Sequence, residues 1–275
     1  MPQYLVSGYL PDNYDPSTMS EAMVEQIHSK KRFSGGKTMR ENKVGAIVIQ
    51  SFALLVVLGT VRQAMAQDAT TPYPKTAPIE EYLMDRTAET TLARSAAPES
   101  ISRDATILVL GLQGYETAAK GTNGFVCLVV RMWAAGFDEP EFWNPKVRAP
   151  HCFNAAAARS VLPAYLKRTE LVLAGLTKEQ VLEHMKAEVA KKVFVAPEVG
   201  SMCYMMSKQG YLNDKDGHWH PHLMFFLPPT EAAKWGANVK GAAIYAATGN
   251  PELVTTFFVP VAKWSDGTAD SADGH

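Results

Sequence analysis

The stretch Gly200–Pro228, GSMCYMMSKQGYLNDKDGHWHPHLMFFLP, decides most of what the sequence says about the fold. Two apolar runs, Ser201–Met206 and Trp219–Leu227, flank a polar segment, Ser207–Gly217, that is rich in Asn, Asp, Lys and Gly. This order is typical of two strands joined by a loop. Both faces of the second run are apolar after His222, as in a strand buried in the middle of a sheet. We therefore predict that residues 218–227 form an interior strand of an antiparallel sheet.

Further strand-like runs lie on both sides of this stretch. Turns that contain glycine separate the first three runs and predict a three-stranded meander. A turn with the sequence TGNPE separates the last two runs. The five runs are Thr106–Leu110, Tyr115–Ala119, Phe125–Met132, Ala242–Ala247 and Val254–Val261.

Helical periodicity predicts three helices, over residues 78–96, 155–174 and 178–192. Pro163 is expected to kink the second helix, and Thr177 with Gln180 forms a capping box for the third. The segment 137–154, FDEPEFWNPKVRAPHCFN, reads as a long ordered loop. Six to eight strands and about three helices, grouped rather than alternating, predict an α+β fold with a largely antiparallel sheet.

Overall composition excludes some function classes. The chain has 275 residues, 47% of them hydrophobic, with a formal net charge of −1. A nearly neutral chain whose Lys and Arg residues are scattered gives no electrostatic reason to bind nucleic acid. The region after residue 66 also lacks the GxSxG and SxxK patterns of serine enzymes.

Residues 39–66 carry the features of an export signal. Arg40 and Lys43 precede an apolar stretch from Val44 to Val61, and Ala64-Met65-Ala66 supplies the small-x-small pattern of a cleavage site. A retained membrane anchor is the alternative, because about eighteen apolar residues approach the length that spans a bilayer. Either way we expect residues 67–275 to form a single exported domain, periplasmic or secreted, that meets the membrane only through this segment.

Residues 1–38 are expected to be an upstream extension, with Met39 as the true start. The run MPQYLVSGYLPDNYDPSTMSEAMVEQIHSK resembles the opening strand and helix of the YCII-related (DGPF) family. A lone strand and helix bury too little surface to fold alone.

The remainder resembles a family of exported bacterial proteins of unknown function. The resemblance is carried by GFVCLVVRMW, FWNPKVRAPHCFN, LPAYLKRTELVLAGLTKEQ and YMMSKQGYLNDKDGHWHPHLMFFLP. It implies a single exported domain over 67–275 and carries no assigned activity.

His218, His220 and His222 are the sharpest chemical feature of the sequence. On a strand that begins early enough, residues two apart project from one side, and imidazole suits zinc or copper. Asp216 is the further ligand that we name for this set; Asp214 and His151 are alternatives. The competing interpretation is that these histidines cap the end of a buried strand. Methionines 202, 205, 206 and 224 hint at a soft Cu(I) site, although methionine on a strand usually fills the core.

Three cysteines in an oxidising compartment suggest one disulfide and one buried thiol. We predict the pair Cys127–Cys152, because a bridge would secure the long loop to the meander; three buried thiols are the alternative. Cys203 lies between methionines and a tyrosine, in surroundings that raise a thiol pKa. The five tryptophans either line a pocket or pack in the core.

Two function classes follow from these observations. The first is an exported, non-catalytic binding or structural module that takes an unknown small molecule or envelope component in an aromatic-lined cleft. The second is a metal-dependent hydrolase or oxidase that uses the histidine cluster.

Overall fold

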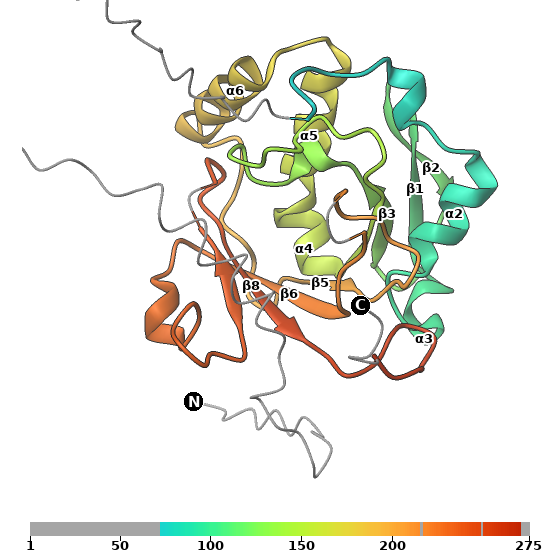
Figure 1. The fold of residues 1–275 in the computed structure, drawn as a ribbon, viewed down its shortest axis with the longest axis vertical. Helices are drawn as coiled ribbons and strands as arrows, with labels where there is room; N and C mark the ends of the chain where they lie inside the picture. Colours follow the sequence, from blue (N-terminus) through green and yellow to red (C-terminus); the bar gives the residue numbers. More distant parts are fainter. Residues whose placement is uncertain (1–71, 215–216, 249, 271–275) are drawn as a thin grey trace, which may run out of the picture. The chain divides into compact units, whose positions relative to one another are not determined.

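The computed structural model describes residues 72–214, 217–248 and 250–270, all within one compact unit (Figure 1). The expectations for residues 1–66, including the export signal, lie outside this range. The strands are β1 (Thr106–Gly111), β2 (Gly114–Ala119), β3 (Val126–Val130), β4 (Ala149–Phe153), β5 (Met202–Met205), β6 (His222–Leu227), β7 (Tyr245–Ala247) and β8 (Thr255–Pro260). The helices are η2 (Ile79–Tyr82), α2 (Arg86–Arg94), α3 (Glu99–Ser102), η3 (Met132–Ala134), α4 (Ala155–Ser160), α5 (Leu162–Leu173), α6 (Lys178–Ala190) and η4 (Ala232–Trp235).

The eight strands form one sheet in the order β2-β1-β3-β4-β5-β6-β8-β7, and β1 with β3 is its only parallel pair among the described residues. An α+β fold with a largely antiparallel sheet is therefore confirmed. Strand β6 lies between β5 and β8, as predicted for an interior strand. It begins at His222 rather than at residue 218.

The predicted three-stranded meander is wrong in its third strand. β1 and β2 form a two-residue hairpin, but β3 lies on the other side of β1 and runs parallel to it. The connecting segment passes the start of β1, where Thr122 N and Asn123 N both donate hydrogen bonds to Asp104 O at 2.8 and 3.3 Å. Gly121 lies so close to this strand that a Cβ atom would stand 2.2 Å from Thr106 N. A glycine is therefore required where the chain crosses over.

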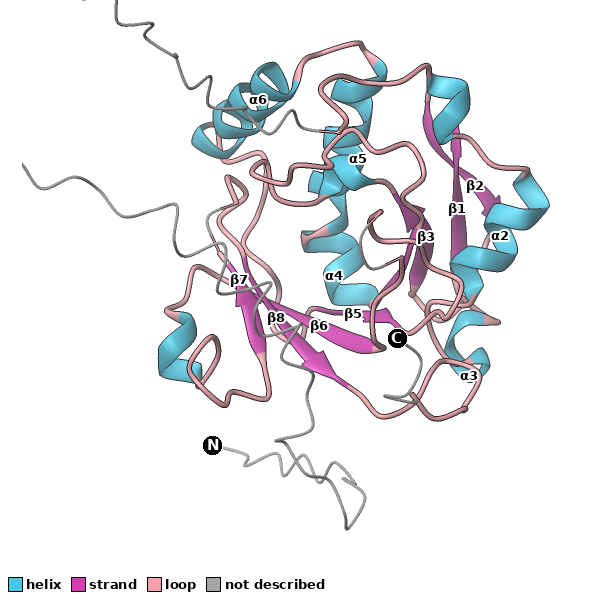
Figure 2. Ribbon diagram, in the orientation of Figure 1, coloured by secondary structure: helices cyan, strands magenta, loops and turns pink. Residues whose placement is uncertain are grey.

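Helices cover the sheet on both faces (Figure 2). Strand β3 is apolar throughout, and its successive side chains alternate between two core clusters. Leu128 and Val130 pack with residues of α4 and α5, whereas Cys127 and Val129 pack with Leu92 of α2. A third cluster joins η2, α5 and α6 to the segment between η3 and β4.

The first predicted helix is divided in the structure. Asp85 caps α2, because its carboxylate accepts hydrogen bonds from Thr87 N and Ala88 N, and a short 3₁₀ turn, η2, precedes it. The second predicted helix breaks at Val161, where Pro163 stands at the start of α5, in line with the expected kink. The capping box of Thr177 and Gln180 at the start of α6 is confirmed.

The long segment before β4 is pinned by aromatic side chains. Phe142 and Trp143 are buried, and the Tyr82 hydroxyl donates a 2.8 Å hydrogen bond to Trp143 O. The predicted loop ends earlier than expected, since residues 149–153 form β4 and pair with β3. Cys152 therefore lies in the sheet rather than in a loop.

Candidate functional site

The three histidines named from the sequence occupy different surroundings. The His218 ring stacks on Trp264, with ring centroids 6.1 Å apart, and His220 Nδ1 lies 2.6 Å from Asp270 Oδ2. His222 alone stands in a strand. Because residues 218–221 precede β6, strand alternation does not place the three rings on one side.

Asp216 lies outside the described residues. Within the described part of the chain, no group of three or more His, Cys, Asp or Glu side chains is arranged to hold a metal ion. The described histidines of the HxHxH motif therefore do not belong to such a metal-binding group within the described residues.

Asp214, an alternative ligand, is engaged by other side chains. Its carboxylate accepts hydrogen bonds from the hydroxyls of Tyr73 and Tyr211 and, at 3.0 Å, from Lys146 Nζ. The hydrogen bonds from Tyr211 and Tyr73 hold the pKa of Asp214 well below its usual range. This network ties the segment before β4 to the segment after β5.

His151, the second alternative ligand named from the sequence, is buried on β4, as is Ala149, whose carbonyl oxygen it contacts. His151 Nδ1 lies 2.8 Å from Ala149 O, and His222 Nδ1 lies 2.8 Å from His220 O. Burial lowers the pKa of both imidazoles from 6.5 to about 4. Both rings are therefore neutral at pH 7.

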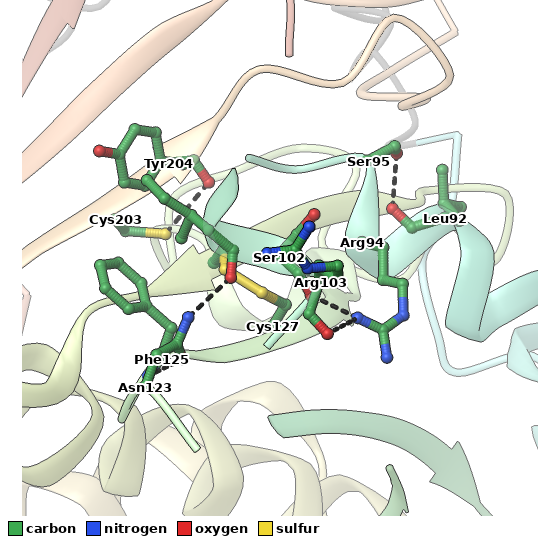
Figure 3. The surroundings of a disulfide bond; sticks show 12 residues. Leu92, Arg94, Ser95, Ser102, Arg103, Asn123, Phe125, Cys127, Cys203 and Tyr204 are labelled. Carbon is green, nitrogen blue, oxygen red and sulfur yellow. Dashed lines mark hydrogen bonds between the residues drawn. A yellow bond between two sulfur atoms is a disulfide. The ribbon is translucent and has the colours of Figure 1, made fainter. Parts of the chain in front are cut away.

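Cys127 and Cys152 form a disulfide with an S–S distance of 1.98 Å (Figure 3). The two residues are directly opposite in the β3–β4 ladder and face α2, so the bond links neighbouring strands. Cys203 is free and buried, and burial raises its thiol pKa well above the ordinary value. A thiol held protonated in this way is a poor nucleophile.

Two buried ion pairs were not predicted. Glu89 Oε1 accepts from Arg131 Nη1 at 2.9 Å, and both side chains are 0% exposed. The second pair, Arg168 with Glu252, is bidentate at 2.5 and 2.8 Å. The only available signal for Glu89 is its spacing from Leu92 and Ala93, which places it on the buried stripe of α2.

A concavity open to solvent lies between α4, α5 and the start of β8. It contains about 470 Å³ of space free of protein atoms, open solvent included. Tyr165, Phe194 and Val195 contribute apolar wall, and the Arg168–Glu252 pair forms a polar part of it. Of the five tryptophans considered from the sequence, none lines this concavity: four are buried in packing positions, and Trp235 is exposed.

These features define an α+β domain with an eight-stranded sheet, a cross-strand disulfide and an open concavity beside α5. The chain matches no known family model, no curated protein and no solved structure. None of the helices in the described ranges has the length and apolar character needed to cross a membrane.

Proposed function

We propose that this chain is an exported binding module that takes a small, largely apolar ligand into the concavity beside α5. The observation that carries the proposal is a concavity partly walled by apolar side chains, one of which, Val195 at its rim, is 59% exposed. Ligand sites are concave and mostly apolar, with a few polar groups that orient the ligand.

The polar groups of the wall indicate what kind of ligand fits. Arg168 Nη1 donates to Ala135 O at 2.6 Å, and Nε and Nη2 donate to Glu252. The Ser160 hydroxyl is engaged as well, since it donates to Ala156 O and accepts from Glu198 N. Because these groups already have partners, they favour a ligand held by apolar contact with Tyr165 and Phe194 over a strongly charged one.

The test uses ligand-observed NMR with indole, p-cresol and benzoate as probes on the full chain. Saturation transfer is expected for indole and p-cresol and not for benzoate. Val195→Asp should abolish it, because the new carboxylate stands at the rim. Val199→Asp is the matched control: Val199 is fully exposed in the same segment and does not line the concavity. Equal signals from both variants, or no transfer from any probe, would refute the proposal.

Export is the second half of the proposal and rests on the pattern in residues 39–66. Mass spectrometry of the protein made in bacteria should find an N-terminus close to Gln67. An intact Met1 on protein recovered from the cytoplasm would contradict it. The hydrolase or oxidase is based on the HxHxH cluster, whose histidines occupy different surroundings, so the binding module is the single function that we propose.

A further inference from the structure

The strand register brings together side chains that are far apart in the sequence. Cys152 pairs with Tyr204 and Phe153 with Cys203, so the next position along the same antiparallel ladder sets His151 beside Met205. Met205 in turn pairs with His222. Directly opposite residues project to the same face of a sheet, so His151, Met205 and His222 form one row across β4, β5 and β6.

This row is buried on the face that α4 and α5 cover. The three side chains are 6%, 6% and 8% exposed, and Met205 belongs to the core cluster that contains Leu128, the cross-strand partner of His151. The charge of one imidazole also disfavours a charge on the other. The two histidines thus lie on the same face of the sheet, on strands that only β5 separates, although 71 positions separate them in the sequence.

Both imidazoles of the row are oriented in the same way. Each Nδ1 lies 2.8 Å from the carbonyl oxygen two residues earlier in the chain. A carbonyl oxygen only accepts, so Nδ1 carries the proton and Nε2 keeps its lone pair. Metal-binding histidines are typically oriented in this way, with the second ring nitrogen donating to a backbone carbonyl.

His222 Nε2 is the observation that points to a ligand. This atom is buried and has no hydrogen-bond partner within the described part of the chain. A buried polar atom without a partner is costly, and a coordinated ion would satisfy its lone pair. The His222 ring packs against the rings of Trp219 and Phe258, with ring centroids 6.4 and 5.7 Å apart.

We propose that His151 Nε2, the Met205 thioether and His222 Nε2 bind one Cu(I) ion. Thioether sulfur is a soft ligand that favours Cu(I), whereas Zn²⁺ takes thiolate, imidazole and carboxylate. Among the described residues no cluster of three or more His, Cys, Asp or Glu is suited to a metal, so these residues offer no zinc site of ordinary composition around this row. The site shares only His222 with the HxHxH set, and it is independent of the concavity beside α5.

The test measures Cu(I) binding to the full chain in the absence of oxygen, by competition with the chromophoric chelator bicinchoninate. We expect one equivalent for the unchanged protein, with a copper–sulfur distance in its X-ray absorption spectrum. Met205→Leu should weaken binding by at least about tenfold, the effect typical of losing a group that supports a metal site, and should remove the sulfur signal. Zn²⁺ should not compete.

Matched variants distinguish this row from a copper site elsewhere in the chain and from a general loss of structure. Met224→Leu changes a thioether that is equally buried, next but one to His222 on β6, and should leave Cu(I) binding unchanged. His218→Ala should also leave it unchanged, whereas a site built on the HxHxH set would lose the ion. The melting temperature of each variant reports whether it is folded. Absence of Cu(I) binding by the unchanged protein, or equal binding by folded Met205→Leu and Met224→Leu, would overturn the proposal.

Discussion

Replacing Glu89 by Gln tests whether the buried ion pair between α2 and the end of β3 sustains the fold. Glu89 Oε1 accepts from Arg131 Nη1 at 2.9 Å and from Leu110 N at 3.2 Å. Arg131 also donates through Nε to Tyr82 O at 2.9 Å and through Nη1 to Val129 O. The pair thus connects α2, two strands and the turn η2. The glutamine keeps the shape of the side chain but removes the charge that balances Arg131.

Removing one partner of a buried pair leaves the other charge uncompensated and costs about 3–5 kcal/mol. For a domain of this size each kcal/mol lowers the melting temperature by about 2–4 °C, so the expected decrease is roughly 6–20 °C. The control is Glu116→Gln, which removes the exposed partner of Arg86, where the side chains are 51% and 62% exposed. Such a surface pair contributes at most about 1 kcal/mol.

Urea unfolding followed by circular dichroism measures both effects, and the slope m should be unchanged, because the surface exposed on unfolding is the same. A double variant, Glu89→Leu with Arg131→Met, should be more stable than Glu89→Gln, since it leaves no unpaired charge in the core. If Glu89→Gln and Glu116→Gln differ by less than about 1 kcal/mol, the buried pair does not have the role assigned to it.

Two further predictions concern the crossover and the buried imidazoles. Gly121→Ala should prevent stable folding, since its Cβ would stand 2.2 Å from Thr106 N. The control, Gly111→Ala, would place its Cβ no closer than 3.4 Å to any neighbouring atom and should fold. Soluble yield and melting temperature compare the two variants, and equal stability would contradict the crossover argument. In metal-free protein, His151 and His222 have folded-state pKa values near 4 against 6.5. The free energy of unfolding should be highest above pH 6.5 and should decrease as the pH falls toward 4, by about 3 kcal/mol for each imidazole. The reason is that the unfolded chain binds more protons than the folded protein in this pH range. A flat urea midpoint between pH 7 and pH 4.5 would refute this.

Much of the fold could be predicted because local patterns determine it. The run Leu223–Leu227 is apolar on both faces, and this property belongs to an interior strand whatever its neighbours are. The Thr177 capping box and the break near Pro163 likewise depend on a few adjacent residues. The start of α2 was recoverable too, since Asp85 is a good N-cap that the apolar periodicity alone did not reveal.

The order of the strands could not be predicted in the same way. Glycines on either side of β2 indicate turns, but they do not say whether the next strand lies beside β2 or on the far side of β1. The close approach of Gly121 to Thr106 in the folded structure belongs to the second arrangement, in which the chain passes β1 and β3 lies on its far side. Extending the register of Cys152 with Tyr204 by one position sets His151 beside Met205, and this depends on β4 and β5 being neighbours in the sheet, which no local pattern reveals. The sequence therefore drew attention to His218 and His220 instead.

The histidine row depends on register, and two neighbouring features of β4 fix that register. A slip of one residue would turn His151 to the α2 face, because side chains alternate along a strand. On one edge of β4, the disulfide of Cys152 with Cys127 holds the strand against β3. On the other edge, Asn154 N donates to Met202 O at 3.0 Å and Asn154 Oδ1 accepts from Met202 N at 3.2 Å. A covalent bond to β3 and the two hydrogen bonds of Asn154 to β5 therefore fix the register of β4 at both edges, and a fixed register is the preorganisation that a buried metal ligand requires.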